Sequence, residues 1–204
     1  MLPMTRYILI SFVLVSFFVV QALAQEQPGD RGAALAVAAV ERTTHHVTYD
    51  GSYRPIAYPM GDVPDDRGVC TDVIIRSYRA IGVDLQQLIH EDMGANFNTY
   101  PKLWGLARPD ANIDHRRVPN IRRFLERQGA EVPASRDVKD YLPGDLVTWN
   151  LVSTGSLPHT GIVSSRASEH GVPLVVHNIG GGPKLDDVLF AYEMTGHYRY
   201  LPSS

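Results

Sequence analysis

The chain begins with an apolar run. Residues 7–20 carry no charge, and Arg6 is the only charged residue in front of them. Two small residues, Ala22 and Ala24, follow the run. One basic residue, a short apolar stretch and an A-x-A site are typical of a secretory signal peptide, whereas a membrane-spanning helix needs about 20 apolar residues. We therefore predict that residues 1–24 are a cleaved signal peptide and that the mature protein is periplasmic or secreted, with no stable membrane anchor.

Helices are predicted in the first half of the remaining chain, where apolar residues recur at helical spacing. The predicted segments are 33–42, 69–81, 84–90 and 118–125. Gly82 and Gly129 follow two of them, as is typical of helix ends. Residues 25–31 are polar and contain proline and glycine, which predicts a linker before the first helix. Residues 96–114 have no clear period, and we expect a long surface loop there.

From residue 138 onward the pattern changes to short strands. Apolar and branched residues form brief runs separated by turn residues. The predicted strands are 145–149, 159–163, 174–178 and 192–200. Helices therefore lead and an antiparallel sheet follows, which predicts an α+β fold. We place this domain at residues 45–204, after a linker and helix at 25–44.

Composition narrows the class of protein without identifying it. The 204 residues are 44% hydrophobic and 20% charged, as in an ordinary globular domain. A formal net charge of −3 argues against a dedicated nucleic-acid binder, which needs a concentrated basic face. Cys70 is the single cysteine, which excludes an internal disulfide and any zinc site built from several cysteines. No other residue pattern indicates a metal or a cofactor, and we expect none.

Cys70 lies in the first turn of the helix predicted at 69–81. The positive end of a helix dipole favours a thiolate, so we expect the pKa of Cys70 to lie below its usual value of about 8.5. In an oxidising compartment an unpaired thiol has to be either buried or useful. Taken alone, Cys70 fits a small core residue as well as a reactive thiol.

Two histidines lie on the predicted strands. His159 opens one strand, and Gly161 leaves room beside it. Strand alternation places His177 where it could face His159 across neighbouring strands. A nucleophilic thiol needs a base, and that base needs a group that fixes its tautomer. Cys70, His159 and His177 form a candidate catalytic set in this order along the chain, with Asn178 as the alternative third residue.

Four short segments resemble a known group of enzymes. They are GVCTDV at 68–73, PGDLV at 143–147, HTGIV at 159–163 and VVHN at 175–178. In this order they resemble the NlpC-type cell-wall peptidases of the papain-like clan, and more closely the family designated domain of unknown function 1287. The resemblance spans about residues 49–202. It implies a papain-like fold in which the nucleophile lies at a helix N-terminus packed on an antiparallel sheet.

The resemblance also implies an activity and further site residues. It suggests a secreted thiol hydrolase that cleaves an amide bond in peptidoglycan, with a stem-peptide endopeptidase favoured over an amidase. The tyrosine that such enzymes carry in a Y-x-x-G context corresponds to Tyr58, which would bind the oxyanion or the substrate carbonyl. Asp72 and Asn178 are further candidates for oxyanion or substrate binding. The group's usual aspartate before the cysteine is Val69 here, so the hydrogen bonds at the helix tip must differ.

Two other classes of function remain open on the sequence. A papain-like thioester intermediate can be passed to an acceptor other than water, which would make the protein an acyltransferase or a thioesterase. A protein of the same fold without the chemistry would be an envelope-binding module, although Cys70 and His159 are both present. The expected partner is peptidoglycan or another envelope component, and no nucleic acid is expected.

Overall fold

The computed structural model describes residues 28–202, so the predicted signal peptide lies outside the described residues. The helices are α1 (Pro28–Arg42), α2 (Cys70–Ala80), α3 (Leu85–Asn96) and α4 (Val118–Arg127), with 3-10 turns at η1 (Phe97–Thr99), η2 (Asp114–Arg116) and η3 (Val138–Asp140). The strands are β1 (Thr48–Tyr49), β2 (Arg67–Gly68), β3 (Leu146–Asn150), β4 (Pro158–Ala167), β5 (Pro173–His177), β6 (Lys184–Asp186) and β7 (Glu193–Tyr198).

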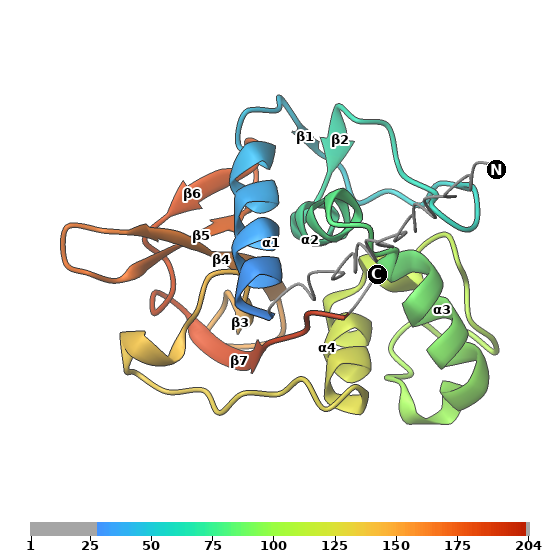
Figure 1. The fold of residues 1–204 in the computed structure, drawn as a ribbon. Helices are drawn as coiled ribbons and strands as arrows, with labels where there is room; N and C mark the ends of the chain where they lie inside the picture. The colour runs from blue at the N-terminus through green and yellow to red at the C-terminus, as the bar shows by residue number, and fades with distance from the viewer. Residues whose placement is uncertain (1–27, 203–204) are drawn as a thin grey trace, which may run out of the picture.

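Five of the strands form one antiparallel sheet in the order β6-β5-β4-β3-β7. The two-residue strands β1 and β2 pair in parallel, and β2 ends two residues before α2 begins. Figure 1 shows the sheet on one side of the molecule and α3 on the other, with α1 and α2 between them. All four α-helices precede this sheet in the sequence, which confirms the predicted α+β fold.

The face of the sheet that the helices cover holds the larger core. Leu146, Ile162 and Val176 point to this side and are fully buried. Leu35 and Ala39 of α1 belong to the same core, together with residues of α2, α3 and α4. Helix α1 therefore packs as part of this core, although the sequence suggested a separate N-terminal segment.

The opposite face of the sheet is also buried. Val147, Trp149, Val163 and Val175 pack there in a second, smaller core, against residues that include Leu189. In the register of the sheet His159 lies opposite Trp149, and His177 lies opposite Gly161. Since directly paired residues share a face, both histidines lie on the same side as this smaller core.

Several predicted elements differ from the structure. Helix α1 begins at Pro28, inside the expected linker, because proline in a first helical turn lacks only an N–H that the helix does not use. Helix α3 runs on to Asn96 rather than ending near residue 90. Strand β6 was not expected, since it is only three residues long and follows a glycine turn at 180–182.

Candidate active site

Cys70 is the first residue of α2, and groups from β1 and β4 interact with its thiol. Its side chain is buried, with 5% of the residue exposed. The backbone of Thr160 on β4 lies close enough to the thiol to lower its pKa. The side chain of Tyr49 on β1 also lies close to the thiol, and the two groups interact electrostatically. Because Thr160 directly follows His159, the helix tip is held beside the start of the strand that carries this histidine.

The expected low pKa of Cys70 is wrong for this structure. Burial raises the pKa of the thiol to about 11, and the charge of Asp72 acts in the same direction. Backbone hydrogen bonds at Thr160 and Thr71 act against this rise without cancelling it. Desolvation therefore outweighs the helix dipole, and the site at rest contains a neutral thiol.

His159 and His177 are in direct contact. Nε2 of His159 lies 2.9 Å from Nδ1 of His177, and both residues are at most 2% exposed. The ring of His159 is also stacked at 5.9 Å on Trp149. Burial lowers the pKa of His159 to about 4, and it also lowers the pKa of His177. Both rings are therefore neutral near pH 7 and able to accept a proton.

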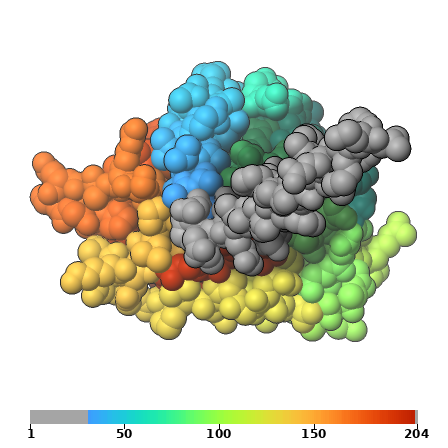
Figure 2. All heavy atoms as spheres, in the orientation of Figure 1, coloured from blue at the N-terminus to red at the C-terminus, as the bar shows by residue number. Residues whose placement is uncertain are grey.

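The two histidines lie at one end of their hairpin. His159 is near the start of β4 and His177 is the last residue of β5, so the connection between the strands lies at the opposite end. Figure 2 shows this connection, in orange, projecting at the left of the molecule. The site thus lies at the end of the sheet where α2 begins.

Gly161 is required by the close approach of β5. A Cβ atom at this position would lie 2.6 Å from Cγ1 of Val175 and 2.8 Å from the carbonyl oxygen of Val176. It would also lie 3.2 Å from Cβ of His177. The first two distances are shorter than real Cβ contacts and the third is tighter than most, so a larger residue must displace β5.

Replacing Gly161 with alanine is expected to lower the free energy of unfolding by about 1–3 kcal/mol, as for other overpacked cores. The control is Gly94→Ala in α3, where an added Cβ meets nothing within 4 Å. That variant is expected to gain about 0.5–1 kcal/mol, because alanine favours a helix. Urea denaturation of both variants measures the difference. Equal stabilities would contradict the close approach of β5.

Asp72 has a different place from the one predicted. Its Oδ2 accepts the backbone N–H of Val69 at 2.6 Å, which satisfies a free donor at the start of α2. Both of its carboxylate oxygens also accept hydrogen bonds from Arg116, at 2.8 and 2.9 Å. With both oxygens engaged inside the protein, Asp72 fixes the helix tip and is not free to bind substrate.

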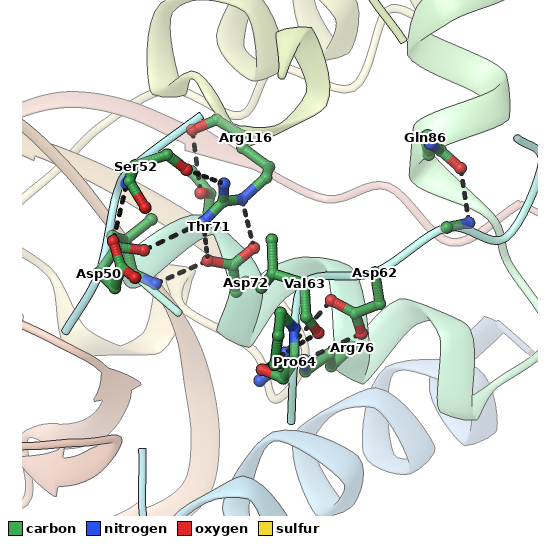
Figure 3. Close-up of polar contacts among 12 residues, drawn as sticks. Asp50, Ser52, Asp62, Val63, Pro64, Thr71, Asp72, Arg76, Gln86 and Arg116 are labelled. Atoms are coloured by element: carbon green, nitrogen blue, oxygen red, sulfur yellow. Dashed lines mark hydrogen bonds and ion pairs between the residues drawn. The ribbon is translucent and has the colours of Figure 1, made fainter. Parts of the chain in front are cut away.

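Arg116 connects this ion pair to the segment in front of β2. The same guanidinium donates to the carbonyl oxygens of Asp50 and Ser52, at 3.3 and 3.4 Å. Figure 3 shows Arg116 lying between Asp72 at the start of α2 and these two residues. Because Asp50 directly follows Tyr49, the guanidinium ties the tyrosine that contacts the thiol to the helix that carries it.

Tyr58 is not brought to the thiol. Its ring makes an edge contact with His90 of α3, with 5.0 Å between the ring centroids. Tyr49 contacts Cys70 instead. The Y-x-x-G spacing favoured Tyr58, but the pairing of β1 with β2 sets Tyr49 opposite Gly68, two residues before the cysteine. Only the pairing of β1 with β2 could have identified Tyr49 as the tyrosine next to the thiol.

Asn178 lies apart from the histidine pair. Its Oδ1 accepts the backbone N–H of Gly180. Its Nδ2 is buried and has no hydrogen-bond partner among the residues described. The side chain lines a small cavity with Gly68 and Val69, next to the tip of α2. Of the two candidates for the third residue, the geometry brings His177 to His159.

Asp186 is a site residue that the sequence did not indicate. Its Oδ2 lies 3.2 Å from Nε2 of His177, so the pair of histidines continues to a carboxylate on β6. Strand β6 was not predicted, and an aspartate after a glycine turn has no distinguishing pattern.

No group of three or more potential metal ligands gathers within residues 28–202. None of the helices in that range has the length and apolar character to cross a membrane.

Alkylation of Cys70 is expected to report its raised pKa. With a pKa of about 11, only on the order of one thiol in ten thousand is ionised at pH 7. The rate of reaction with iodoacetamide in the native protein should therefore rise about tenfold per pH unit from pH 7 to 9.5 without levelling off. In urea the same thiol should titrate near its ordinary pKa of about 8.5. A native rate that reaches a plateau below pH 8.5 would show that the thiol is activated at rest.

Comparison with known proteins places the chain in a family. Its structure is similar over 84% of the chain to NlpC1 from Trichomonas vaginalis, with 14% identity and a TM-score of 0.44, and covers 45% of that chain. It is similar over 83% to an N-acetylmuramoyl-L-alanine amidase from Bacteroides uniformis, with 13% identity and a TM-score of 0.47, and covers 98% of that chain. The uncharacterized Escherichia coli protein YijF is 49% identical over 168 residues, which are 82% of this chain and 81% of YijF. Residues 36–200 match the domain of unknown function DUF1287, and the chain belongs to this family.

Proposed function

We propose that the protein is a thiol-dependent hydrolase that cleaves an amide bond in peptidoglycan, within the stem peptide. Two observations carry this proposal: the buried contact between His159 and His177, and the position of Cys70 at the tip of α2, next to the backbone of Thr160, the residue that follows His159. A nucleophilic thiol needs a base and a group that orients the base, and the pair of neutral imidazoles would supply both. The peptidoglycan substrate rests on the resemblance of the sequence motifs to NlpC-type peptidases.

In this proposal the thiol and His159 react together rather than as a preformed ion pair. His159 accepts the proton of Cys70 while the sulfur forms a bond with the substrate carbonyl carbon. The backbone N–H of Cys70, at the positive end of α2, stabilises the oxyanion that develops. The protonated His159 then gives its proton to the leaving amine as the C–N bond breaks, which leaves a thioester.

Water completes the cycle. His159 removes a proton from a water molecule that attacks the thioester, and the proton passes to the departing Cys70 sulfur. The carboxylic acid product leaves, and the thiol is neutral again. The protein acts outside the cytoplasmic membrane in this proposal, because the predicted signal peptide would direct it there.

Mass analysis of purified muropeptides after incubation with the protein tests the proposal. Cleavage within the stem should give two peptide fragments whose summed mass exceeds the substrate by one water. The Cys70→Ala variant should give none, while its circular dichroism matches that of the unchanged protein. Release of the whole stem peptide from the sugar would move the assignment to an amidase. Intact muropeptides, or full activity in Cys70→Ala, would overturn it.

A further inference from the structure

Asp186 extends the histidine pair by one residue. Strand β6 pairs with β5 so that Lys184 lies opposite His177 and Asp186 lies opposite Val175. Asp186 is therefore a diagonal neighbour of His177 on the same face of the sheet. Its carboxylate contacts Nε2 of His177 at 3.2 Å, and Nδ1 of that ring contacts Nε2 of His159 at 2.9 Å. One chain of hydrogen bonds thus crosses three neighbouring strands.

The carboxylate of Asp186 determines which nitrogen of each histidine carries a proton. An ionised carboxylate only accepts hydrogen bonds, so Nε2 of His177 must carry the proton that it shares with Asp186. The neutral ring of His177 then has a lone pair on Nδ1, and Nε2 of His159 must be the donor in their contact. The second nitrogen of His159, Nδ1, is left with a lone pair. That nitrogen is the one able to accept a proton from a thiol.

Without the carboxylate the chain has a second arrangement. His177 could then carry its proton on Nδ1 and donate it to Nε2 of His159. The proton of His159 would in that case lie on Nδ1, and this nitrogen would no longer be a base. Two tautomers of the pair compete, and only one of them can activate Cys70.

We propose that Asp186 is a positioning residue that selects the tautomer in which Nδ1 of His159 is the base. The inference rests on the proposed thiol-dependent function, since it assigns a role in the same reaction. The negative charge of Asp186 also stabilises His159 after this ring has taken the thiol proton. The positive charge on His159 then lies two hydrogen bonds away from Asp186. Lys184, which lies on β6 with Asp186 and directly opposite His177, carries a charge that acts against this effect.

A purely structural role is the alternative, in which the contact only holds the edge strand β6 in place. The side chain of Asp186 is 43% exposed, and ion pairs that are this exposed contribute little to stability. The two roles therefore differ in what they affect. A positioning residue changes the tautomers and the rate, whereas a structural contact changes neither.

Nuclear magnetic resonance of protein with nitrogen-15-labelled histidine reads the tautomers directly and needs no substrate. Unchanged protein should show His177 and His159 each protonated on Nε2. In Asp186→Ala a form of His177 protonated on Nδ1 should appear. The control is Asp187→Ala, which removes the exposed neighbouring carboxylate and should leave the tautomers unchanged. Asp186→Leu keeps the approximate size of the side chain but has no hydrogen-bond acceptor, and it replaces the alanine variant if that protein does not fold.

Steady-state kinetics on the muropeptide substrate supply the second readout. Removal of the carboxylate should lower kcat by about tenfold to a hundredfold, with KM changed by less than about twofold. Unchanged tautomers in the Asp186 variants would overturn the inference, whatever happens to the rate. If no muropeptide is cleaved but the tautomers shift as expected, the proposed substrate fails while the role of Asp186 in the histidine chain stands.

Discussion

Replacing His159 with alanine is expected to lower kcat by about a hundredfold to ten-thousandfold. The thiol of Cys70 has a pKa of about 11, so almost none of it is ionised at neutral pH without help. His159, with a pKa of about 4, is the neutral base that removes the proton during attack. The loss should therefore exceed that of an enzyme whose thiolate exists at rest, because at neutral pH almost no thiolate forms without this base.

The measurement is the rate of stem-peptide cleavage at pH 7 and at higher pH. In His159→Ala the residual rate should rise with pH, since hydroxide can generate the thiolate that the histidine no longer supplies. The control is His46→Ala, which changes an exposed histidine outside the site and should retain full activity. Activity in His159→Ala equal to that of the control would remove His159 from the mechanism.

His177 should matter less than His159. Its ring orients the base through the contact at 2.9 Å but does not touch the thiol proton. We expect a partial loss of activity in His177→Ala. Asn178→Ala separates the two candidates for the third residue, because Asn178 bonds to Gly180 and lies away from the histidines. If Asn178→Ala is the less active variant, the third residue is Asn178.

The sequence was sufficient for the parts of the fold that periodicity records. The apolar spacing that ends at Gly82 predicts a helix over 69–81, and the structure has α2 at Cys70–Ala80. Strand alternation likewise predicts that His159 and His177 meet, and they do so at 2.9 Å. Both features depend only on local spacing and on the pairing of neighbouring strands.

Features that depend on long-range packing could not be predicted. Tyr49 reaches Cys70 only because the two-residue strands β1 and β2 pair, which no periodicity reveals. The helix tip suggested a low pKa for Cys70, but burial reverses the shift, and burial is a property of the assembled core. Asp186 belongs to a strand too short to recognise. In each case the determining contact joins segments that are distant along the chain or carry no pattern of their own.

The same limit applies to Asp72, whose position suggested substrate binding. Val69 precedes α2 and has no side-chain acceptor, so the free N–H groups of the first turn need another partner. The N–H of Asp72 donates to the carbonyl oxygen of Val69 instead. The carboxylate of Asp72 accepts the N–H of Val69 at 2.6 Å, and Arg116, 44 residues further along the chain, pairs with this buried charge. With valine at residue 69, the hydrogen bonds at the helix tip therefore come from the backbone of Val69 and from the pair of Asp72 and Arg116.

Replacing Arg116 with methionine is expected to lower the free energy of unfolding by about 3–5 kcal/mol. The side chains of Arg116 and Asp72 are only 2% and 4% exposed, so the variant leaves a buried carboxylate without its partner. It also releases the carbonyl oxygens of Asp50 and Ser52. The loss is a large part of the total stability of an ordinary domain, about 5–15 kcal/mol.

Urea denaturation compares this variant with Arg123→Met on α4. Arg123 pairs with Glu126 at 3.0 Å, but its side chain is 43% exposed, and such pairs contribute about 0–1 kcal/mol. The double variant Asp72→Leu with Arg116→Met removes both charges and should recover part of the loss, because apolar residues can replace a buried ion pair. Recovery should stay incomplete, since Asp72 also accepts the N–H of Val69. Equal stability of Arg116→Met and Arg123→Met would show that the buried pair does not hold the start of α2.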